Sequence, residues 1–248
     1  MAGNSAKPGV SVLSRALAAL GAFDEEHRRL SLSEIARRAD LPVATAFRLV
    51  GELVEGGLLA RAASGDYVIG RRMWDLGLLS PVQSELRQVA SPFLHDIYGA
   101  TLATVHLAVR DGTEVLYVDR LSGHASVPVV SQVGTRLPLH ATGVGKVLLA
   151  HAPPEVQAAV YADLTRITAY TITQPGRLRQ ELDRVQRDGY ATTHEEMSLG
   201  ACSVAVPIRT RDGRVVAALG IVVPSLKRDR PRLVAALGVA AQGIGRSI

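Results

Sequence analysis

The feature that most constrains the fold of this chain is a tight break at Asp40-Leu41-Pro42 between two short helical patterns. The first pattern covers residues 32–39, and the second starts at the proline and runs to about Glu55. Proline disfavours helical backbone in the residue before it but suits the first turn of a new helix. Gly56-Gly57 ends the second helix, because glycine tolerates the left-handed conformation of a helix C-cap. Two short helices joined in this way predict a helix-turn-helix.

Apolar spacing predicts a third helix before this pair and defines the buried faces. A helical stripe runs from Val12 to Phe23, with Ser11 in position to cap it. The first helix of the pair can be capped by Ser31 or Ser33. On the second helix of the pair, the side chains expected to point inward are Phe47, Val50, Leu53 and Val54.

A hairpin is expected directly after the pair. Residues 58–61 and 67–69 read as two strands, and they flank the turn sequence Ala62-Ala63-Ser64-Gly65-Asp66. A hairpin in this position is a wing. We therefore expect residues 1–70 to form a winged helix-turn-helix that binds DNA.

In a helix-turn-helix, the first residues of the second helix face base edges in the major groove. Arg48 can donate two hydrogen bonds to a guanine, and the Thr45 hydroxyl can reach a base or a phosphate. Arginines on the preceding helix and in the wing suit contacts to the phosphate backbone. The alternative is an ordinary packing module whose arginines are only solvated surface. The residues expected to contact DNA are Arg37, Arg38, Val43, Ala44, Thr45, Arg48 and Arg61.

The net charge of the chain is compatible with nucleic-acid binding but does not by itself predict it. The net charge is +5 and the isoelectric point is about 9.7. Residues 1–72 hold 10 Lys and Arg against 8 Asp and Glu, which leaves 18 against 15 in the rest of the chain. The positive excess is therefore not concentrated in the predicted DNA-binding domain. The prediction of DNA binding rests on the order of helices and strands instead.

The single cysteine, Cys202, excludes an internal disulfide framework and a cysteine-rich zinc site, and it fits a reducing compartment. Residues 1–10 lack the apolar core of a secretory signal. No uninterrupted apolar run approaches the ~18 residues that cross a bilayer. We expect a cytoplasmic protein with no membrane partner.

Two apolar helical patterns follow the wing, at Arg71–Leu79 and from Val82 to about Tyr98, with an interruption at Ser80-Pro81. Helices with this much apolar surface between domains usually pack on a partner. We expect residues 71–98 to form linker and dimerisation helices.

Residues 99–248 predict a separate α+β domain with an antiparallel sheet. Hairpin signals at Asp111-Gly112 and Asp212-Gly213 are each flanked by two strand patterns, rather than by regular strand-helix alternation. Other strands are expected at Val127–Val133 and Tyr190–Glu195. Helices are expected at Gly143–His151, Pro154–Leu164, Gly176–Arg187 and Arg230–Ile244.

A series of short motifs along nearly the whole chain resembles the isocitrate-lyase-regulator (IclR) family of bacterial transcription factors. Their order and spacing together are specific, although no single motif is. The resemblance implies a GAF-like effector domain and dimers, often paired into tetramers. The motifs are Leu32–Ala36, Leu41-Pro42, Thr45–Leu49, Glu55–Leu59, Leu137–Lys146, Asp188–Ala191, Glu195-Glu196 and Val204–Pro207.

The same resemblance implies an effector pocket closed by Thr142-Gly143-Val144, with opposite walls from Thr193, Ser203, Gly220 and Val222. Several of these residues depart from the family's common pattern: Thr193 stands where an acid is frequent, and Ser203 stands where a cysteine is frequent. Gly220 and Val222 are less polar than the serines that hold a small carboxylate in some members. On the DNA side, Val43 and Ala44 stand where a basic residue and a serine are usual.

A pocket with few polar groups leaves a small hydrophilic acid desolvated without compensation. This favours a larger or more apolar effector, such as an aromatic or alicyclic acid. The backbone amides of Gly143 and Val144, at a helix start, can receive its carboxylate.

An enzyme is the main rival class, and no motif supports it. The chain has no Gly-x-Ser-x-Gly elbow, His194-Glu195-Glu196 lacks the second histidine of a zinc motif, and Gly143–Val147 fails the pattern of a phosphate loop. We expect no cofactor. His106 and His140 are interpreted as core or loop histidines, with pocket contact left open for His140 because it precedes Gly143. Glu195 and Glu196 are interpreted as structural or dimer-surface charges, and Cys202 as a small apolar residue. A second alternative is a dimeric small-molecule sensor without DNA binding.

Overall fold

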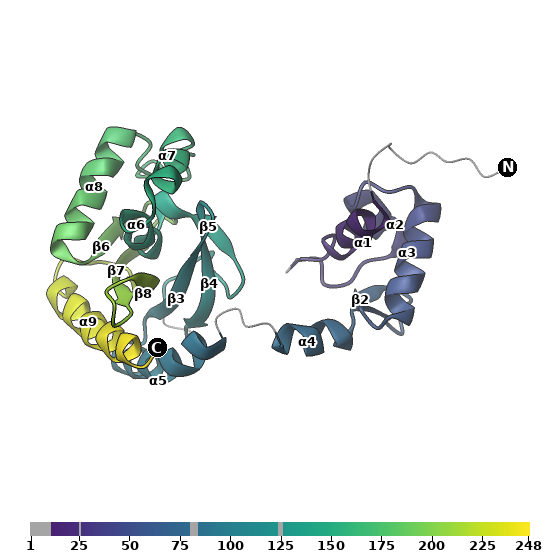
Figure 1. The fold of residues 1–248 in the computed structure, drawn as a ribbon, viewed down its shortest axis with the longest axis horizontal. Helices are drawn as coiled ribbons and strands as arrows, with labels where there is room; N and C mark the ends of the chain where they lie inside the picture. Colours follow the sequence, from purple (N-terminus) through teal and green to yellow (C-terminus); the bar gives the residue numbers. More distant parts are fainter. Residues whose placement is uncertain (1–10, 25, 80–83, 124–125) are drawn as a thin grey trace. The chain divides into compact units, whose positions relative to one another are not determined.

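The computed structural model describes residues 11–24, 26–79, 84–123 and 126–248. The chain divides into two compact units, residues 1–81 and 82–248 (Figure 1). The expected interruption at Ser80-Pro81 and the expected helix start at Val82 lie outside the described residues. Within the described ranges, no helix is both long enough and apolar enough to span a membrane.

The N-terminal unit is a helix-turn-helix with a small hairpin, as predicted. Its elements are α1 (Val12–Leu20), α2 (Leu32–Arg38), α3 (Val43–Glu55), β1 (Leu59–Arg61), β2 (Tyr67–Ile69) and α4 (Arg71–Leu78). Ser31 caps α2 in a capping box, in which its hydroxyl accepts from the Glu34 amide and the Glu34 carboxylate accepts from the Ser31 amide. A small core of buried apolar residues holds α1, α2, α3 and β1 together.

One expected core residue of this unit is not buried. Phe47 is 66% exposed, whereas Val50 and Leu53 are buried as predicted and Val54 packs at the core's edge. The buried stripe of α3 is Ala46, Leu49, Val50 and Leu53. Leu49, which the sequence analysis named only as part of a family motif, is buried in the core where Phe47 was expected.

The C-terminal unit is built on a six-stranded antiparallel sheet, which confirms the predicted α+β class. The strand order is β5-β4-β3-β8-β7-β6. The strands are β3 (Thr104–Asp111), β4 (Glu114–Leu121), β5 (Arg136–Pro138), β6 (Ala191–His194), β7 (Cys202–Arg209) and β8 (Val215–Val223). The helices are α5 (Ser84–Thr101), α6 (Gly143–Ala150), α7 (Pro154–Ala162), α8 (Pro175–Asp188) and α9 (Arg230–Arg246).

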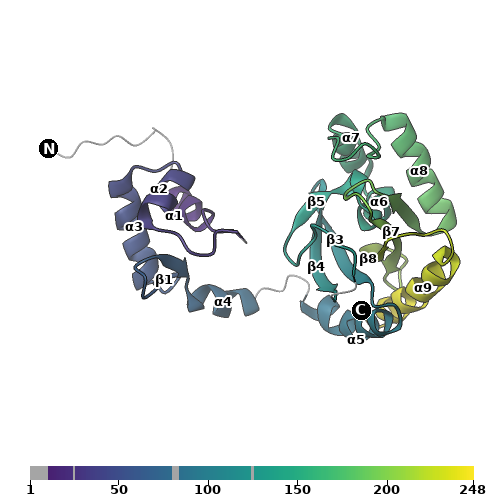
Figure 2. The same ribbon diagram turned by 180° about the vertical axis from the view of Figure 1, so that it is seen from behind.

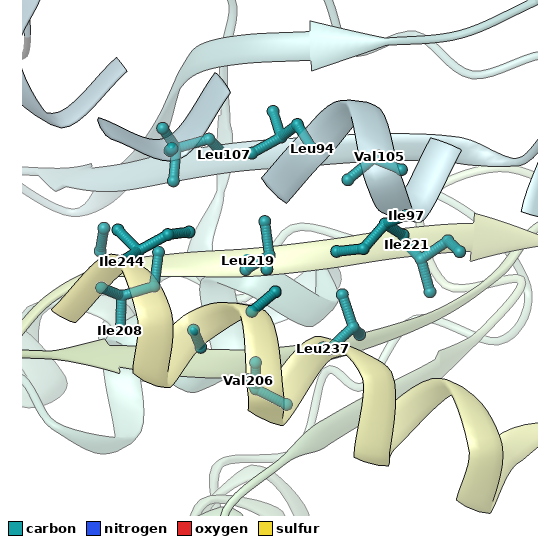
Figure 3. Packing of buried hydrophobic residues seen from close by; sticks show 14 of the residues in the cluster. Leu94, Ile97, Val105, Leu107, Val206, Ile208, Leu219, Ile221, Leu237 and Ile244 are labelled. Atoms are coloured by element: carbon teal, nitrogen blue, oxygen red, sulfur yellow. The ribbon is translucent and has the colours of Figure 1, made fainter. Parts of the chain in front are cut away.

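Helices cover both faces of this sheet. Helices α5 and α9 lie against one face, and α6 and α8 lie on the other (Figures 1 and 2). Figure 3 shows the first of these layers, where Leu94 of α5 and Leu237 and Ile244 of α9 pack on Leu219 and Ile221 of β8. The second layer leaves space at the start of α6, and the candidate effector site lies there.

The predicted strand at Val127–Val133 is wrong. This segment has no regular strand pairing, and the edge strand next to β4 is β5, with Leu137 opposite Val115. The segment instead bends at Gly134, whose φ is +90° and whose amide donates to the Tyr117 carbonyl. Its β-branched residues were read as a strand, but Val129, Val130 and Ser131 line a cavity.

Candidate recognition helix and effector cavity

Backbone hydrogen bonds fix the turn between α2 and α3. Asp40 adopts a positive φ of 52°, and the Leu41 amide donates to the Ala36 carbonyl at 2.9 Å. Pro42 is the N-cap, and its carbonyl accepts from the Thr45 and Ala46 amides at 2.9 Å each. The two helices are thereby fixed at the start of α3, where a helix-turn-helix places its base contacts.

The expected base-contacting residues share the solvent side of α3. Val43, Ala44 and Arg48 are exposed, and Thr45 is half-buried. Phe47 joins them on this side. The first turn of α3 carries no acidic residue, so the positive end of the helix dipole is not neutralised there.

The three expected phosphate-contacting arginines differ in their surroundings. Arg37 is exposed near the end of α2. The Arg38 Nε donates to the Ala22 carbonyl at 2.6 Å and its guanidinium pairs with Asp24, so this side chain ties α2 to the end of α1. Arg61 lies over the Tyr67 ring at 5.9 Å from its centroid and donates to the Gly65 carbonyl. Arg38 is thus already engaged within the unit.

All seven residues expected at the effector site line one cavity, of about 50 Å³, between α6 and the sheet. Strand register brings three of them together, because Thr193 of β6 lies opposite Ser203 of β7, which lies opposite Val222 of β8. The walls are mainly apolar. The seven expected lining residues are Thr142, Gly143, Val144, Thr193, Ser203, Gly220 and Val222.

Two glycines let α6 approach the sheet at the cavity. A Cβ on Gly143 would lie 2.5 Å from the Ser203 Oγ, and one on Gly220 would lie 2.7 Å from a methyl group of Val144. Both distances are shorter than real Cβ contacts, so a side chain at either position would force Ser203 or Val144 to shift. The start of α6 therefore lies directly over β7 and β8.

The start of α6 supplies backbone donors to the cavity. Thr142 is the N-cap, and its hydroxyl accepts from the Gly145 amide at 3.1 Å while its carbonyl accepts from the Lys146 amide. The first amides of a helix have no acceptor within the helix. Gly143 and Val144 therefore present their N–H groups at the positive end of the α6 dipole.

Two pairs of polar side chains face the same cavity. The Thr193 and Ser203 hydroxyls are 2.5 Å apart, and the His106 Nε2 is 2.8 Å from the Ser131 Oγ. The His106 ring also packs edge-on against Tyr117, with ring centroids 4.9 Å apart. Burial, together with the nearby Arg120, lowers the pKa of His106 to about 3, and burial raises that of Tyr117. Both rings are consequently uncharged at neutral pH.

The sequence interpretation missed several lining residues. His106 was read as a core or loop histidine, whereas its pairing with Ser131 makes it part of the cavity wall. Conversely, His140, the histidine considered for pocket contact, is buried outside the lining, where its Nε2 bonds the Thr165 carbonyl at 3.0 Å. The missed residues include Tyr117, Ser131, Met197 and Ser198 together with His106, and only their place in the sheet and loops reveals them.

A buried ion pair connects α6 with the loop that follows β6. The Lys146 Nζ lies 2.6 Å from the Glu196 Oε1, and their side chains are only 1% and 8% exposed. Burial raises the pKa of Glu196, while the Lys146 charge opposes that shift. Glu196 is therefore structural, as expected, but in the core rather than at a surface.

Further bonds hold this loop beside the cavity. The Thr171 hydroxyl donates to the Glu196 carbonyl at 2.8 Å, and the Thr168 hydroxyl donates to the Glu195 carbonyl at 2.7 Å. Met197 and Ser198, the next residues, line the cavity. In the described part of the chain, no group of three or more His, Cys, Asp and Glu side chains is placed to hold a metal ion.

A helix-turn-helix unit joined to a sheet domain with a mainly apolar internal cavity is typical of ligand-responsive, DNA-binding regulators. Comparison of the sequence with known domain families identifies the family. Residues 12–63 match the IclR helix-turn-helix domain, and residues 81–246 match the C-terminal domain of bacterial IclR transcriptional regulators. The chain belongs to the IclR family of transcriptional regulators, which are not enzymes.

Individual relatives match over nearly the full chain. The glycerol operon regulatory protein of Streptomyces coelicolor is 34% identical over 245 residues, which is 96% of each chain. The transcriptional repressor AllR of Klebsiella pneumoniae is 31% identical over 93% of this chain and 86% of its own. An IclR homologue from Microbacterium hydrocarbonoxydans, crystallised with 4-hydroxybenzoate, is 38% identical, with a TM-score of 0.91 over 96% of this chain and 98% of that one.

Proposed function

We propose that this regulator binds a pseudo-palindromic operator as a dimer, with operator affinity modulated by a small aromatic carboxylate held in the cavity. The observation that carries the proposal is the cavity itself. It combines apolar walls with two helix-start amides and two adjacent hydroxyls, a donor set suited to one carboxylate. The relative crystallised with 4-hydroxybenzoate supports an aromatic acid as the ligand class.

In this proposal, the carboxylate lies at the start of α6, where Gly143, Val144 and the Thr193–Ser203 hydroxyl pair meet. The ring lies against the apolar walls. His106 and Ser131 provide hydrogen-bonding groups for a second polar substituent. Neutral His106 suits this role because it introduces no buried charge beside the ring.

The cavity must widen to admit such a ring. Its volume of about 50 Å³ holds a few water molecules, whereas an engineered cavity that binds benzene measures ~150 Å³. The walls that can yield are the flexible side chain of Met197 and the segment around Val130, which is outside the sheet and 54% exposed at that residue. Ligand entry then moves these loop segments, and this movement can transmit the effect of ligand binding to the rest of the protein.

On the DNA side, α3 of each subunit enters one of two successive major grooves. Arg48 and Thr45 read bases, with Val43 and Ala44 beside them, and Arg37 and Arg61 contact phosphates. Arg38 positions α2 instead, because its guanidinium is held by Asp24 and the Ala22 carbonyl.

Dimerisation is supported by apolar side chains that the N-terminal unit leaves exposed. Val12, Leu13 and Leu17 of α1 are 58%, 68% and 58% exposed, and Trp74 of α4 is 68% exposed. Surfaces of this kind on a small unit usually meet a partner. We propose a homodimer, able to pair into a dimer of dimers, with residues 1–70 binding DNA, 71–98 linking and dimerising, 99–248 binding the effector, and the whole protein acting in the cytoplasm.

Calorimetric titration with 4-hydroxybenzoate and with the uncharged 4-hydroxybenzyl alcohol tests the effector class. Because charge-assisted hydrogen bonds contribute about 1.5–3 kcal/mol, the acid is expected to bind at least tenfold more tightly than the alcohol. Equal affinities, or binding of neither compound, would remove the aromatic carboxylate from the proposal.

A further inference from the structure

The solvent side of α3 carries an apolar patch at its N-terminal half. Phe47 and Val43 are 66% and 54% exposed, and Ala44 is exposed between them on the helix surface. A side chain at Gly51, one turn further on, would meet no neighbouring atom, so the patch is open on that side. The charged neighbour in this half is Arg48.

The N-terminal unit does not use this patch. The opposite side of α3 packs into the core, where Leu49 and Val50 are 3% and 0% exposed. Sequence spacing placed Phe47 in that core, but the helix turns it outward. A contiguous exposed apolar patch of this kind is typical of an interaction surface.

The chemistry of the major groove restricts what that contact can be. Base edges there are hydrogen-bond donors and acceptors, with a single apolar group, the C5 methyl of thymine. Acidic residues of α3 lie in its second half, at Glu52 and Glu55, where DNA phosphates would repel them. The first turn has none, so the apolar patch lies on the half of α3 that can approach DNA.

We propose that Val43, Ala44 and Phe47 read thymine methyl groups, so that each half-site carries thymines next to the guanine bound by Arg48. This inference rests on the proposed function, and it makes Phe47 a specificity-determining residue. Burial of one methyl group is worth about 0.8 kcal/mol, which corresponds to about a fourfold change in affinity for each thymine contacted.

The test compares thymine with uracil, which lacks only the methyl group. The full-length protein first selects a duplex from a random-sequence pool, and the selected duplex is then made with deoxyuridine in place of every thymine. Dissociation constants for both duplexes are measured with wild type, Phe47→Ala and Arg48→Ala. Thermal melting checks that the variants fold, which the exposure of Phe47 leads us to expect.

We expect wild type to bind the uracil duplex at least fourfold more weakly, Phe47→Ala to lose most of that ratio, and Arg48→Ala to bind more weakly while keeping it. Equal binding of both duplexes by wild type would overturn the inference while leaving the proposed function intact. An unchanged ratio in Phe47→Ala would show that Phe47 does not read thymine methyl groups, which would also overturn the inference. A lower sedimenting mass for Phe47→Ala would overturn it as well, in favour of a contact between copies. Failure to select any duplex would instead count against the proposed function.

Discussion

Replacing Glu196 by alanine is expected to lower the free energy of unfolding by about 3–5 kcal/mol, because the change leaves a buried lysine charge without its partner. Lys146 is 1% exposed, and among the described residues its Nζ has only the Thr192 carbonyl, at 3.3 Å, besides the Glu196 carboxylate. Urea denaturation of the full chain, followed by circular dichroism, measures the loss.

A double variant provides the matched control for this prediction. Lys146→Met combined with Glu196→Met removes both charges and keeps similar volume, so most of the stability should return. If Glu196→Ala alone were as stable as wild type, the pair would not be desolvated as its 2.6 Å contact and burial indicate.

Replacing Gly143 by leucine is expected to abolish binding of 4-hydroxybenzoate, with a loss of at least about 100-fold, while leaving operator binding in place. A Cβ at this position would already lie 2.5 Å from the Ser203 Oγ, and the rest of the leucine side chain would fill the cavity at the start of α6. Calorimetry measures the effector affinity, and a gel-shift titration measures operator binding.

Gly176 offers a matched control, because it lies in α8 and an added side chain there would meet no neighbouring atom. Gly176→Leu should bind the effector as wild type does. Ser203→Ala provides a milder second variant, which keeps the fold and should weaken the acid more than the neutral alcohol. Normal effector affinity in Gly143→Leu would place the effector site elsewhere.

Local patterns predicted most of the architecture. The helix-turn-helix follows from Pro42 and the capping serine Ser31, and the two hairpins follow from Asp111-Gly112 and Asp212-Gly213, because these signals act through the nearest residues. The strand expected at Val127–Val133 failed because β-branched composition does not say whether a neighbouring strand is free to pair.

The residues of the effector cavity, unlike those expected to contact DNA, could be predicted only from the family resemblance. It named the seven cavity residues, since motif positions carry over along the chain. It could not name the Lys146–Glu196 pair, whose partners are 50 residues apart and meet only through the packing of α6 on the sheet. Phe47 was misplaced because 3.6-residue spacing leaves a residue near the edge of the apolar stripe free to face either way.

The coupling between effector and operator tests the central claim most directly. Dissociation constants for the selected operator duplex are measured with and without saturating 4-hydroxybenzoate, and constants for 4-hydroxybenzoate are measured with and without the duplex. We predict that each ligand changes the affinity of the other by the same factor, between about 5-fold and 150-fold. Operator affinity that stays the same whether or not the effector is bound would contradict the account.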